Sequence, residues 1–368
     1  MFHVKHFGKI GVLFRSKLMA QPSAIPQARR VPCLIQIANC RLMIRLSVTV
    51  ERFPIRGKFV IARGAKTEAV VIVATIEDGG FRGRGEAVPY ARYGETVESV
   101  LAQIASVHPT IEAGVGRGRL QKLLPPGAAR NALDCALWDF DAKRSGIAAH
   151  VLAGVAPPVP VTTAFTISAG SPADMATAAL AAGGRPLLKI KLMGEGDRER
   201  LVAVRAAAPG ATLIVDANEA WSKTNLERNL EACAEAGVLL VEQPLPAGED
   251  TALASIRHIV PVCADESVHA RDGLESLRAR YDAINVKLDK TGGLTEALET
   301  VNLARSLGFK LMIGCMVASS LAMAPALLLA RSAHFVDLDG PLLLEHDRPE
   351  GLTYRGSFVH PPIRELWG

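Results

Sequence analysis

The first pattern in this chain is an alternation of hydrophobic and polar residues over residues 43–77. The stretch IRLSVTV alternates residue by residue and AVVIVATIE is rich in β-branched residues, and both features are typical of strands. After a glycine-punctuated turn and the polar loop PYARYGE, apolar residues recur at helical spacing over residues 97–107 and, more clearly, over residues 128–144. The first part of the chain therefore predicts a small α+β module.

A different rhythm begins after the proline-rich joint at residues 156–158. Short β-branched strands alternate there with alanine-rich helices, and the strands are VTTAFTI, LLKIKL, TLIVDA, VLLVEQ, PVCADE, AINVKL, KLMIGC and HFVDLD. Eight units of similar length favour a closed barrel of the TIM type over a doubly wound sheet, which would alternate in the same way. No GxGxxG sequence follows any of these strands, which argues against a nucleotide-binding sheet. We therefore predict an α/β fold with its chemistry at the C-terminal ends of barrel strands.

Composition and charge narrow the range of partners. Of the 368 residues, 49% are hydrophobic and 21% are charged, an ordinary balance for a globular protein with a large core. The formal net charge is +5, but the first 42 residues carry seven basic residues and no acid, so the remainder has a net charge of −2. Because the body of the protein is not basic, we expect no nucleic-acid partner.

Residues 1–42 show no strong periodicity and lack the apolar core of a secretory signal. They share the Arg-rich, acid-poor character of a transit peptide, but we expect a disordered or spurious extension, with Met43 opening the first domain. The longest apolar run, residues 321–330, is interrupted by Pro325 and is too short to span a membrane. The six cysteines form no CxxC pair and no disulfide pattern, which predicts a reducing, cytoplasmic location.

Three carboxylates end consecutive predicted barrel strands: Asp216, Glu242 and Asp265. From Lys191 to Lys287 the polar strand ends follow one another at intervals of 22 to 26 residues, one βα unit each, so a barrel brings them to one mouth. Three convergent carboxylates require a cation, and oxygen ligands select Mg²⁺ or Mn²⁺. The alternative is that each acid is a separate helix cap or surface residue.

Three lysines share this predicted mouth. Lys189 and Lys191 stand two apart in LLKIKL, so both point to the same face of their strand, and Lys287 ends AINVKL on the far side. Lysines inside a barrel are costly unless carboxylates or a metal offset their charge. We expect neighbouring cations to lower a lysine pKa toward neutrality and so create a usable base; solvated lysines at strand ends are the alternative.

Five motifs occur in an order that resembles a known family: LLKIKL, VDANEAW, VEQPLP, CADESV and NVKLDKTGGLTEAL. They resemble the muconate-lactonising subgroup of the enolase superfamily, and the resemblance covers nearly the whole chain after residue 42. It implies an N-terminal α+β capping domain over residues 43–156 and a modified TIM barrel, (β/α)₇β, over residues 157–340. A C-terminal segment, residues 341–368, is expected to return to the capping domain.

The same resemblance implies roles for the acids and lysines. It places one Mg²⁺, for which Mn²⁺ can substitute, on Asp216, Glu242 and Asp265. Lys191 and Lys287 are implied as opposed acid and base residues. Lys189 is implied to share, with the metal, the negative charge that develops on the substrate.

Two further features resemble the dipeptide epimerases of this subgroup. Asp337 and Asp339 form a DxD pair at the last predicted strand, and such a pair receives the α-ammonium group of the substrate in those enzymes. Arg63, in KFVIARGAKTEA, resembles the flexible-loop arginine that binds a glutamate side chain in epimerases of L-Ala-D/L-Glu. The resemblance thus implies 1,1-proton transfer at the Cα of the second residue of a dipeptide, in murein peptide recycling. A capped loop and a surface arginine are the alternatives for these two features.

Other residues near these motifs are candidates for the substrate pocket. Arg56 and Lys58 compete with Arg63 for the glutamate side chain. Cys315 has no histidine at a recognisable triad spacing, so we expect it to line the pocket rather than act as a nucleophile. The remaining residues expected to contact substrate are Thr166 and Met316.

Other functions remain open at this stage. Other two-lysine members of the subgroup are N-acylamino acid racemases, o-succinylbenzoate synthases and cycloisomerases, whose substrates lack a free α-ammonium group. A catalytically inactive barrel that acts as a binding protein is the alternative from another class. The expected partner is a small dipeptide, with no nucleic acid and no membrane, and formation of a homo-oligomer is left open.

Overall fold

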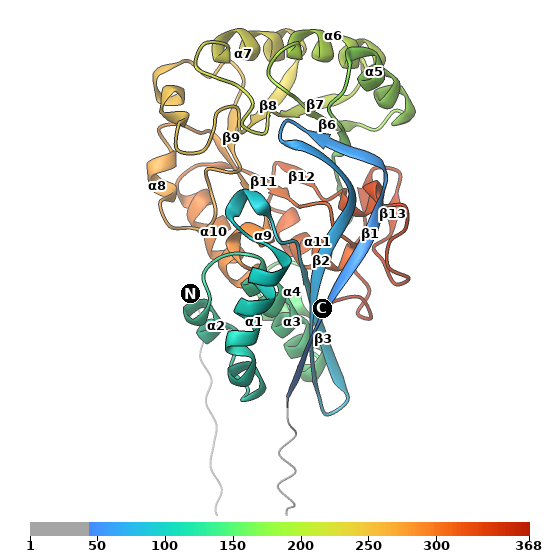
Figure 1. Cartoon of the computed structure of the whole chain (residues 1–368), viewed down its shortest axis with the longest axis vertical. Helices are drawn as coiled ribbons and strands as arrows, with labels where there is room; N and C mark the ends of the chain where they lie inside the picture. The colour runs from blue at the N-terminus through green and yellow to red at the C-terminus, as the bar shows by residue number, and fades with distance from the viewer. Residues whose placement is uncertain (1–43) are drawn as a thin grey trace, which may run out of the picture. The chain divides into compact units, whose positions relative to one another are not determined.

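The computed structural model describes residues 44–368, which fall within one compact unit (Figure 1). The expectation for residues 1–42, and for Met43 as the start of the first domain, lies outside the described residues. Within residues 44–368, no helix has both the length and the apolar character that crossing a membrane requires.

A long antiparallel sheet opens the described chain, with strands β1 (Arg45–Ile61), β2 (Gly64–Asp78) and β3 (Phe81–Ala87). The pairing of β1 with β2 shifts register between Pro54 and Phe59, where the proline cannot donate a ladder hydrogen bond. The β1–β2 hairpin extends from the helices of the N-terminal part to the mouth of the barrel beside β6 (Figure 1). Its tip, at Ala62 and Arg63, is thereby brought to the C-terminal ends of barrel strands.

Helices pack on this sheet: η1 (Ala91–Tyr93), α1 (Val97–Glu112), α2 (Arg117–Leu123), α3 (Ala128–Ser145) and α4 (Ala149–Leu152). Thr96 and Ser99 start α1 with a reciprocal capping box, in which each side chain bonds the other's backbone N–H. The buried helix α3 packs on β3, where a Cβ at Gly83 or Gly85 would overlap the α3 backbone. Both predicted helices of this module are confirmed.

The second part is a barrel of eight parallel strands, which confirms the predicted fold class. The strands are β5 (Phe165–Ile167), β6 (Leu187–Lys191), β7 (Thr212–Asp216), β8 (Val238–Glu242), β9 (Val262–Ala264), β10 (Ala283–Val286), β11 (Lys310–Gly314) and β12 (Phe335–Asp337). The helical segments are α5 (Pro172–Ala181), α6 (Asp197–Ala207), α7 (Leu226–Glu235), η2 (Asp250–Ser255), α8 (Leu274–Leu277), α9 (Leu288–Thr291), α10 (Leu294–Ser306), α11 (Ser320–Ala330) and η3 (Gly340–Leu343). The chain before β5 meets β12 through a hydrogen bond from Ala164 N to Val336 O of 2.8 Å, which joins the first and last strands.

The first predicted barrel strand, VTTAFTI, is divided in the structure. Its start forms β4 (Val161–Thr162), which pairs with β14 (Phe358–Val359) rather than with a barrel strand. β14 pairs in turn with β13 (Tyr354–Arg355), so a small three-stranded sheet contains part of the C-terminal segment. Residues 161 and 162 are in a strand as predicted, but their assignment to the barrel was wrong, because the sequence does not show that a distant hairpin supplies their partner.

Two layers fill the inside of the barrel. The lower layer is an apolar cluster of Ala164, Leu187, Ile214, Leu240, Cys263, Ala283 and Met312. Because side chains two residues apart on a strand share a face, the residues two positions further along form the next layer toward the C-terminal ends. That layer is polar at most positions and contains Thr166, Lys189, Asp216, Glu242, Asp265 and Asn285.

The C-terminal segment packs on the N-terminal helices. Trp367 is buried and donates a hydrogen bond of 3.0 Å from Nε1 to Cys135 O on α3. Gly368 N donates to Asp139 Oδ1 at 2.7 Å, and Arg84 of β3 donates to Leu366 O at 3.2 Å. The domain boundaries at residues 156 and 340 stay a prediction.

Candidate active site

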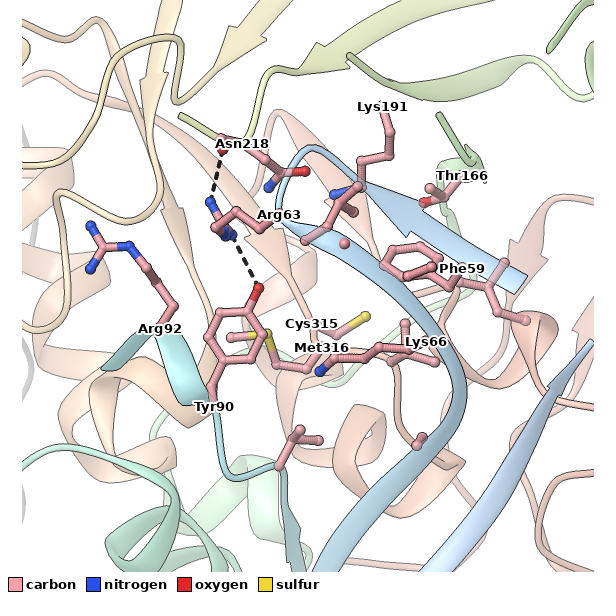
Figure 2. A pocket seen from close by; sticks show the side chains of 18 of the residues that line it. Phe59, Arg63, Lys66, Tyr90, Arg92, Thr166, Lys191, Asn218, Cys315 and Met316 are labelled. Carbon is pink, nitrogen blue, oxygen red and sulfur yellow. Dashed lines mark hydrogen bonds between the residues drawn. The ribbon is translucent and has the colours of Figure 1, made fainter. Parts of the chain in front are cut away.

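A cavity of about 800 Å³ lies where the β1–β2 hairpin meets the barrel mouth (Figure 2). The predicted residues Arg63, Thr166, Cys315 and Met316 all line it, together with both aspartates of the DxD pair. Arg56 and Lys58, the predicted competitors of Arg63, are not among the described residues that line this cavity. The hairpin therefore brings Arg63 to the barrel and leaves the other two away from it.

The three predicted metal ligands lie together, and one of them, Asp265, lines the cavity. Asp216 and Glu242 end β7 and β8, and Asp265 follows β9 directly. All three are buried, and one ligand oxygen from each lies within 4.8 Å of the others. Three buried hard oxygen donors in this arrangement fit a Mg²⁺ or Mn²⁺ ion.

Asp265 is held in place by groups that the sequence analysis did not identify. Gln243 Oε1 accepts a hydrogen bond of 2.8 Å from Asp265 N, and the Gln243 backbone has a strained φ of 35°. Lys290, which is fully buried, donates to Asp265 Oδ1 at 2.6 Å, to Asp265 O at 2.6 Å and to Asn285 O at 2.8 Å. These contacts fix one carboxylate oxygen and the backbone of Asp265. The motif NVKLDKTGG contains Lys290, but the sequence offers no spacing rule that would have assigned this contact.

The three predicted lysines each contact the carboxylate cluster. Lys189 Nζ lies 2.7 Å from Glu242, 2.8 Å from Asp337 and 3.2 Å from Asp216. Lys191 Nζ lies 2.6 Å from Asp216, and Lys287 Nζ lies 2.7 Å from Asp265. Asn285 stands two residues before Lys287 on the same face and donates to Glu242 at 2.7 Å, a contact that strand alternation could have predicted.

Lys191 and Lys287 stand on opposite sides of the barrel. Lys191 ends β6 and Lys287 follows β10, and these strands are separated by three others in an eight-stranded barrel. Their ammonium groups therefore approach the mouth from opposed directions, with the three carboxylates of the intervening strands between them. This is the arrangement that the sequence predicted for a two-base site.

The expected lowering of lysine pKa values is wrong for Lys189 and Lys287. Burial alone would lower the pKa of Lys189, but the charges of Asp337 and Glu242 raise it well above its usual value. Burial alone would likewise lower the pKa of Lys287, but the charges of Asp265 and Glu242 outweigh burial and raise this pKa well above its usual value. The prediction counted neighbouring cations, whereas carboxylates are the nearest charged neighbours in the folded protein.

Two of the three predicted metal ligands have lowered pKa values, whereas burial and the charge of Asp216 raise the pKa of Glu242. Burial alone would raise the pKa of Asp265, but the ammonium groups of Lys287 and Lys290 hold it well below its usual range. Asp216 is also held below its usual pKa, because Lys191 and Lys189 outweigh its burial. Ionised carboxylates are the form that binds a cation, so the lysines keep these two ligands ready for one.

The two aspartates of the DxD pair have different surroundings. Asp337 pairs with Lys189, whereas Asp339 accepts a hydrogen bond of 2.7 Å from Thr166 N. Burial and the charge of Asp337 raise the pKa of Asp339 to about 7. Burial and these two carboxylates also raise the pKa of the Cys315 thiol well above its usual value, which disfavours the thiolate that a nucleophile needs.

Arg63 connects the hairpin to the barrel. One guanidinium nitrogen donates to Asn218 O and Glu219, each at 2.9 Å, and the other donates to Glu266 at 2.6 Å and Tyr90 at 3.1 Å. Figure 2 shows the bonds to Asn218 and Tyr90. Asn218 and Glu219 follow β7 with positive φ values of 45° and 69°, so the backbone after Asp216 is strained where it receives this arginine.

Comparison with protein families and curated proteins agrees with this geometry. Residues 43–154 match the mandelate racemase / muconate lactonizing enzyme N-terminal domain, and residues 172–364 match the enolase C-terminal domain-like family. The chain is 48% identical over 320 residues to the L-Ala-D/L-Glu epimerase of Escherichia coli K12, covering 86% of this chain and all of that protein. It is 45% identical over 302 residues to an N-acetyl-D-glutamate racemase of Pseudoalteromonas, covering 81% of this chain and 95% of that protein.

Solved structures show the same relationship. An enolase family member from Agrobacterium tumefaciens with homology to dipeptide epimerases, solved with sodium and L-Ala-L-Glu, superposes with a TM-score of 0.87 at 54% identity. The match covers 88% of this chain and all of that one. A dipeptide epimerase of Enterococcus faecalis, in complex with Mg and L-Leu-L-Tyr, has a TM-score of 0.80 at 27% identity, covering 87% and 97% of the two chains. The chain described here belongs to the enolase superfamily, in its mandelate racemase / muconate lactonizing family.

Proposed function

We propose that this protein is a dipeptide epimerase that inverts the Cα of the second residue, with L-Ala-D/L-Glu as its substrate. The observation that carries the proposal is the pair of lysines, Lys191 and Lys287, that approach one site from opposed strands of the barrel. Inversion at carbon needs a base on one face and an acid on the other, and this pair supplies both. The relatives from E. coli and A. tumefaciens support the Ala-Glu assignment.

In the proposed mechanism, two of the three lysines transfer protons and the third stabilises negative charge. Asp216, Glu242 and Asp265 would hold a Mg²⁺ ion, which supplies positive charge next to the carboxylate of the substrate when it is bound. One of Lys191 and Lys287 removes the Cα proton, and the other, as an ammonium group, delivers a proton to the opposite face. Lys189 lies among the carboxylates and stabilises the negative charge that develops on the substrate.

The ends of the substrate are bound by charges at the cavity wall. Asp339 lines the cavity with no ammonium or guanidinium partner among the described residues, so it is suited to the free α-ammonium group of a dipeptide. Asp337 stands beside it and completes the DxD pair. Arg63 lines the cavity from the hairpin tip, and we assign it to the side of the cavity that receives the glutamate side chain.

A racemase of N-acylated amino acids is the second candidate, because the Pseudoalteromonas relative acts on N-acetyl-D-glutamate. An N-acyl group is neutral, and it would leave the buried Asp339 without a cationic partner. This difference favours the dipeptide, since an unpaired buried charge is costly.

Solvent deuterium exchange tests the assignment. In D₂O with Mg²⁺, the protein should transfer deuterium to the second Cα of L-Ala-L-Glu, producing a mass increase of about one unit as a D-Glu product appears. N-acetylglutamate should exchange far more slowly. Faster exchange with N-acetylglutamate would promote the racemase, and no exchange with any dipeptide would overturn the function and favour an inactive binding protein.

We further place this activity in the cytoplasm, in the recycling of cell-wall peptides. The cysteines within residues 44–368 are free thiols, and Cys135, Cys233 and Cys263 are buried, which suits a reducing compartment. Deletion of the gene should cause L-Ala-D-Glu to accumulate in the cytosol, and unchanged levels would contradict this placement.

A further inference from the structure

The two oxygens of each predicted metal ligand face different groups. One oxygen of each carboxylate accepts a hydrogen bond from a donor that is fixed in the fold and has no part in the proposed proton transfer. The three bonds run from Asn218 N to Asp216 Oδ1 at 2.9 Å, from Asn285 Nδ2 to Glu242 Oε1 at 2.7 Å, and from Lys290 Nζ to Asp265 Oδ1 at 2.6 Å. All three carboxylates are buried, so an oxygen that lost its donor would be left unpaired at a cost in free energy.

The second oxygen of each carboxylate faces a lysine of the proposed mechanism. Asp216 Oδ2 lies 2.6 Å from Lys191 Nζ, Glu242 Oε2 lies 2.7 Å from Lys189 Nζ, and Asp265 Oδ2 lies 2.7 Å from Lys287 Nζ. Within residues 44–368, Glu242 Oε2 accepts no hydrogen bond despite this short contact. A cation that binds here would therefore meet one exchangeable oxygen from each carboxylate, while the fixed donors keep the other.

Lys290 is held so that it does not release its oxygen. The residue lies on α9 and is 1% exposed. Its ammonium group donates to Asp265 Oδ1 and to the backbone oxygens of Asp265 and Asn285, so all three of its N–H bonds are used. If the Asp265 carboxylate turned to present both oxygens to a cation, one of these bonds would break and the buried ammonium group would be partly unpaired.

Asn285 is confined in a similar way. It lies on β10 and is fully buried, and a Cβ at Gly314 on the neighbouring β11 would lie 2.5 Å from its Oδ1. The amide therefore has little space in which to rotate away from Glu242. Lys287 approaches the same Glu242 oxygen only at 3.8 Å, so the contact from Asn285 is the shorter one.

We propose that Asn285 and Lys290 are positioning residues that make the site select Mg²⁺ over Ca²⁺. Mg²⁺ is small and requires near-octahedral geometry, which single oxygens from separate carboxylates can provide. Ca²⁺ takes more oxygen ligands and often uses both oxygens of one carboxylate. Because Asn285 and Lys290 occupy one oxygen each of Glu242 and Asp265, they remove this option for two of the three ligands. The selection concerns the cation alone, so it holds whichever substrate the protein takes.

The test measures the dissociation constants of Mg²⁺ and Ca²⁺ by calorimetric titration of the metal-stripped, full-length protein. The wild type should bind Mg²⁺ more tightly than Ca²⁺. Asn285→Leu keeps the approximate size of the side chain and removes the donor, and it should weaken Mg²⁺ binding by about 10-fold or more. Ca²⁺ binding should change little, because the released Glu242 oxygen can join its coordination. A residue with only a structural role would weaken the binding of both ions alike.

Lys290→Met removes the second donor together with a positive charge. Loss of that charge should strengthen the binding of both ions, so the ratio of the two dissociation constants is the quantity to compare. The preference for Mg²⁺ should fall by about 10-fold. Lys191→Met is the matched control, because it also removes an ammonium group from a predicted metal ligand, but Asp216 Oδ1 keeps its bond from Asn218 N. Its ratio should equal that of the wild type.

A wild-type protein that binds Ca²⁺ as tightly as Mg²⁺ would overturn the proposal, and so would an Asn285→Leu variant that weakens both ions equally. The same shift of the ratio in Lys191→Met as in Lys290→Met would show that Lys290 acts only through its charge, which would overturn its positioning role. Circular dichroism reports whether each variant folds, and if Lys290→Met does not, Asn285→Leu and the wild type decide alone. These measurements need no substrate, so a failure of the proposed epimerase activity would be seen separately.

Discussion

Three buried lysines lie in one site, but their contacts suit them to different roles, either stabilising charge or transferring a proton. Lys189 lies within 3.2 Å of three carboxylates, so its ammonium group is fixed and suited to constant electrostatic stabilisation. Lys191 has one close carboxylate partner, and Lys287 has one at 2.7 Å and a second only at 3.8 Å. A cation on Asp216 and Asp265 would compete with Lys191 and Lys287 for these carboxylates, which would leave the two ammonium groups available for proton transfer.

Replacement of either opposed lysine should separate proton removal from inversion. Lys191→Ala and Lys287→Ala should each lower epimerisation by at least about 100-fold, because each removes the acid or base of one face. The folded state and the ability to bind Mg²⁺ should be retained, as judged by circular dichroism and calorimetric titration. One variant should still exchange the Cα proton of a single enantiomer in D₂O. Near wild-type turnover in both directions would refute the two-base assignment.

Asp339 should make activity on dipeptides depend on pH near neutrality. Its pKa is raised to about 7, so below pH 7 the carboxyl is increasingly protonated and loses its attraction for the substrate ammonium group. We expect kcat/KM for L-Ala-L-Glu to fall about tenfold per pH unit below pH 6, where the ionised fraction decreases in that proportion.

The control for this pH effect is Asp339→Asn, which cannot ionise. Its kcat/KM for L-Ala-L-Glu should be low at every pH and should show no decrease attributable to position 339. A pH profile of Asp339→Asn that is the same as that of the wild type would assign the titration to another group.

At the scale of secondary-structure elements, strand periodicity predicted most of the site. Lys189 and Lys191 stand on one face of β6, and the acids at the ends of β7, β8 and β9 follow from the parallel order of a barrel. A barrel with its chemistry at the C-terminal ends of strands could therefore be predicted from the sequence alone. The resemblance added the residue roles, which periodicity cannot provide.

Contacts between distant elements were not predictable in the same way. The pairing of β4 with β14 depends on a hairpin nearly 200 residues later, and the three bonds of Lys290 depend on how the turn after β10 folds back. Neither set of contacts follows a period along the chain, so both are visible only in the folded protein.

The close packing of β3 on α3 should be sensitive to a single methyl group. At Gly85 a Cβ would overlap backbone atoms of Ala132 and Ala136, so Gly85→Ala should lower the free energy of unfolding by about 2 kcal/mol or more. Gly118→Ala is the control, since Gly118 lies within α2 with open space around it and alanine favours a helix by about 1 kcal/mol. Urea denaturation should show opposite signs for the two variants. An unchanged free energy of unfolding in Gly85→Ala would mean that β3 and α3 can move apart at little cost.

For the molecule as a whole, the barrel and the N-terminal sheet and helices depend on each other. The hairpin supplies Arg63 to the cavity, and the barrel supplies the acids that hold Arg63. The C-terminal segment adds a second connection, because Trp367 is buried against α3. The cavity is thus shaped by both parts, and neither provides all the charges that the proposed substrate requires.

The balance of charge across the site predicts how the protein responds to removal of metal. Lysine ammonium groups already neutralise the three carboxylates within this structure, so chelation by EDTA should abolish deuterium exchange while the protein stays folded. Added Mg²⁺ must displace part of these ion pairs, and at 100 times its dissociation constant it should raise the free energy of unfolding by about 2.7 kcal/mol. Asp216→Asn should remove most of this increase, because it takes away one ligand charge. Thermal unfolding with EDTA and with Mg²⁺ measures whether the metal-free protein stays folded and how much Mg²⁺ stabilises it. Unfolding on chelation would show that the lysines do not neutralise the carboxylates in place of the metal. Full turnover in metal-free protein would show that the metal is not needed for the reaction.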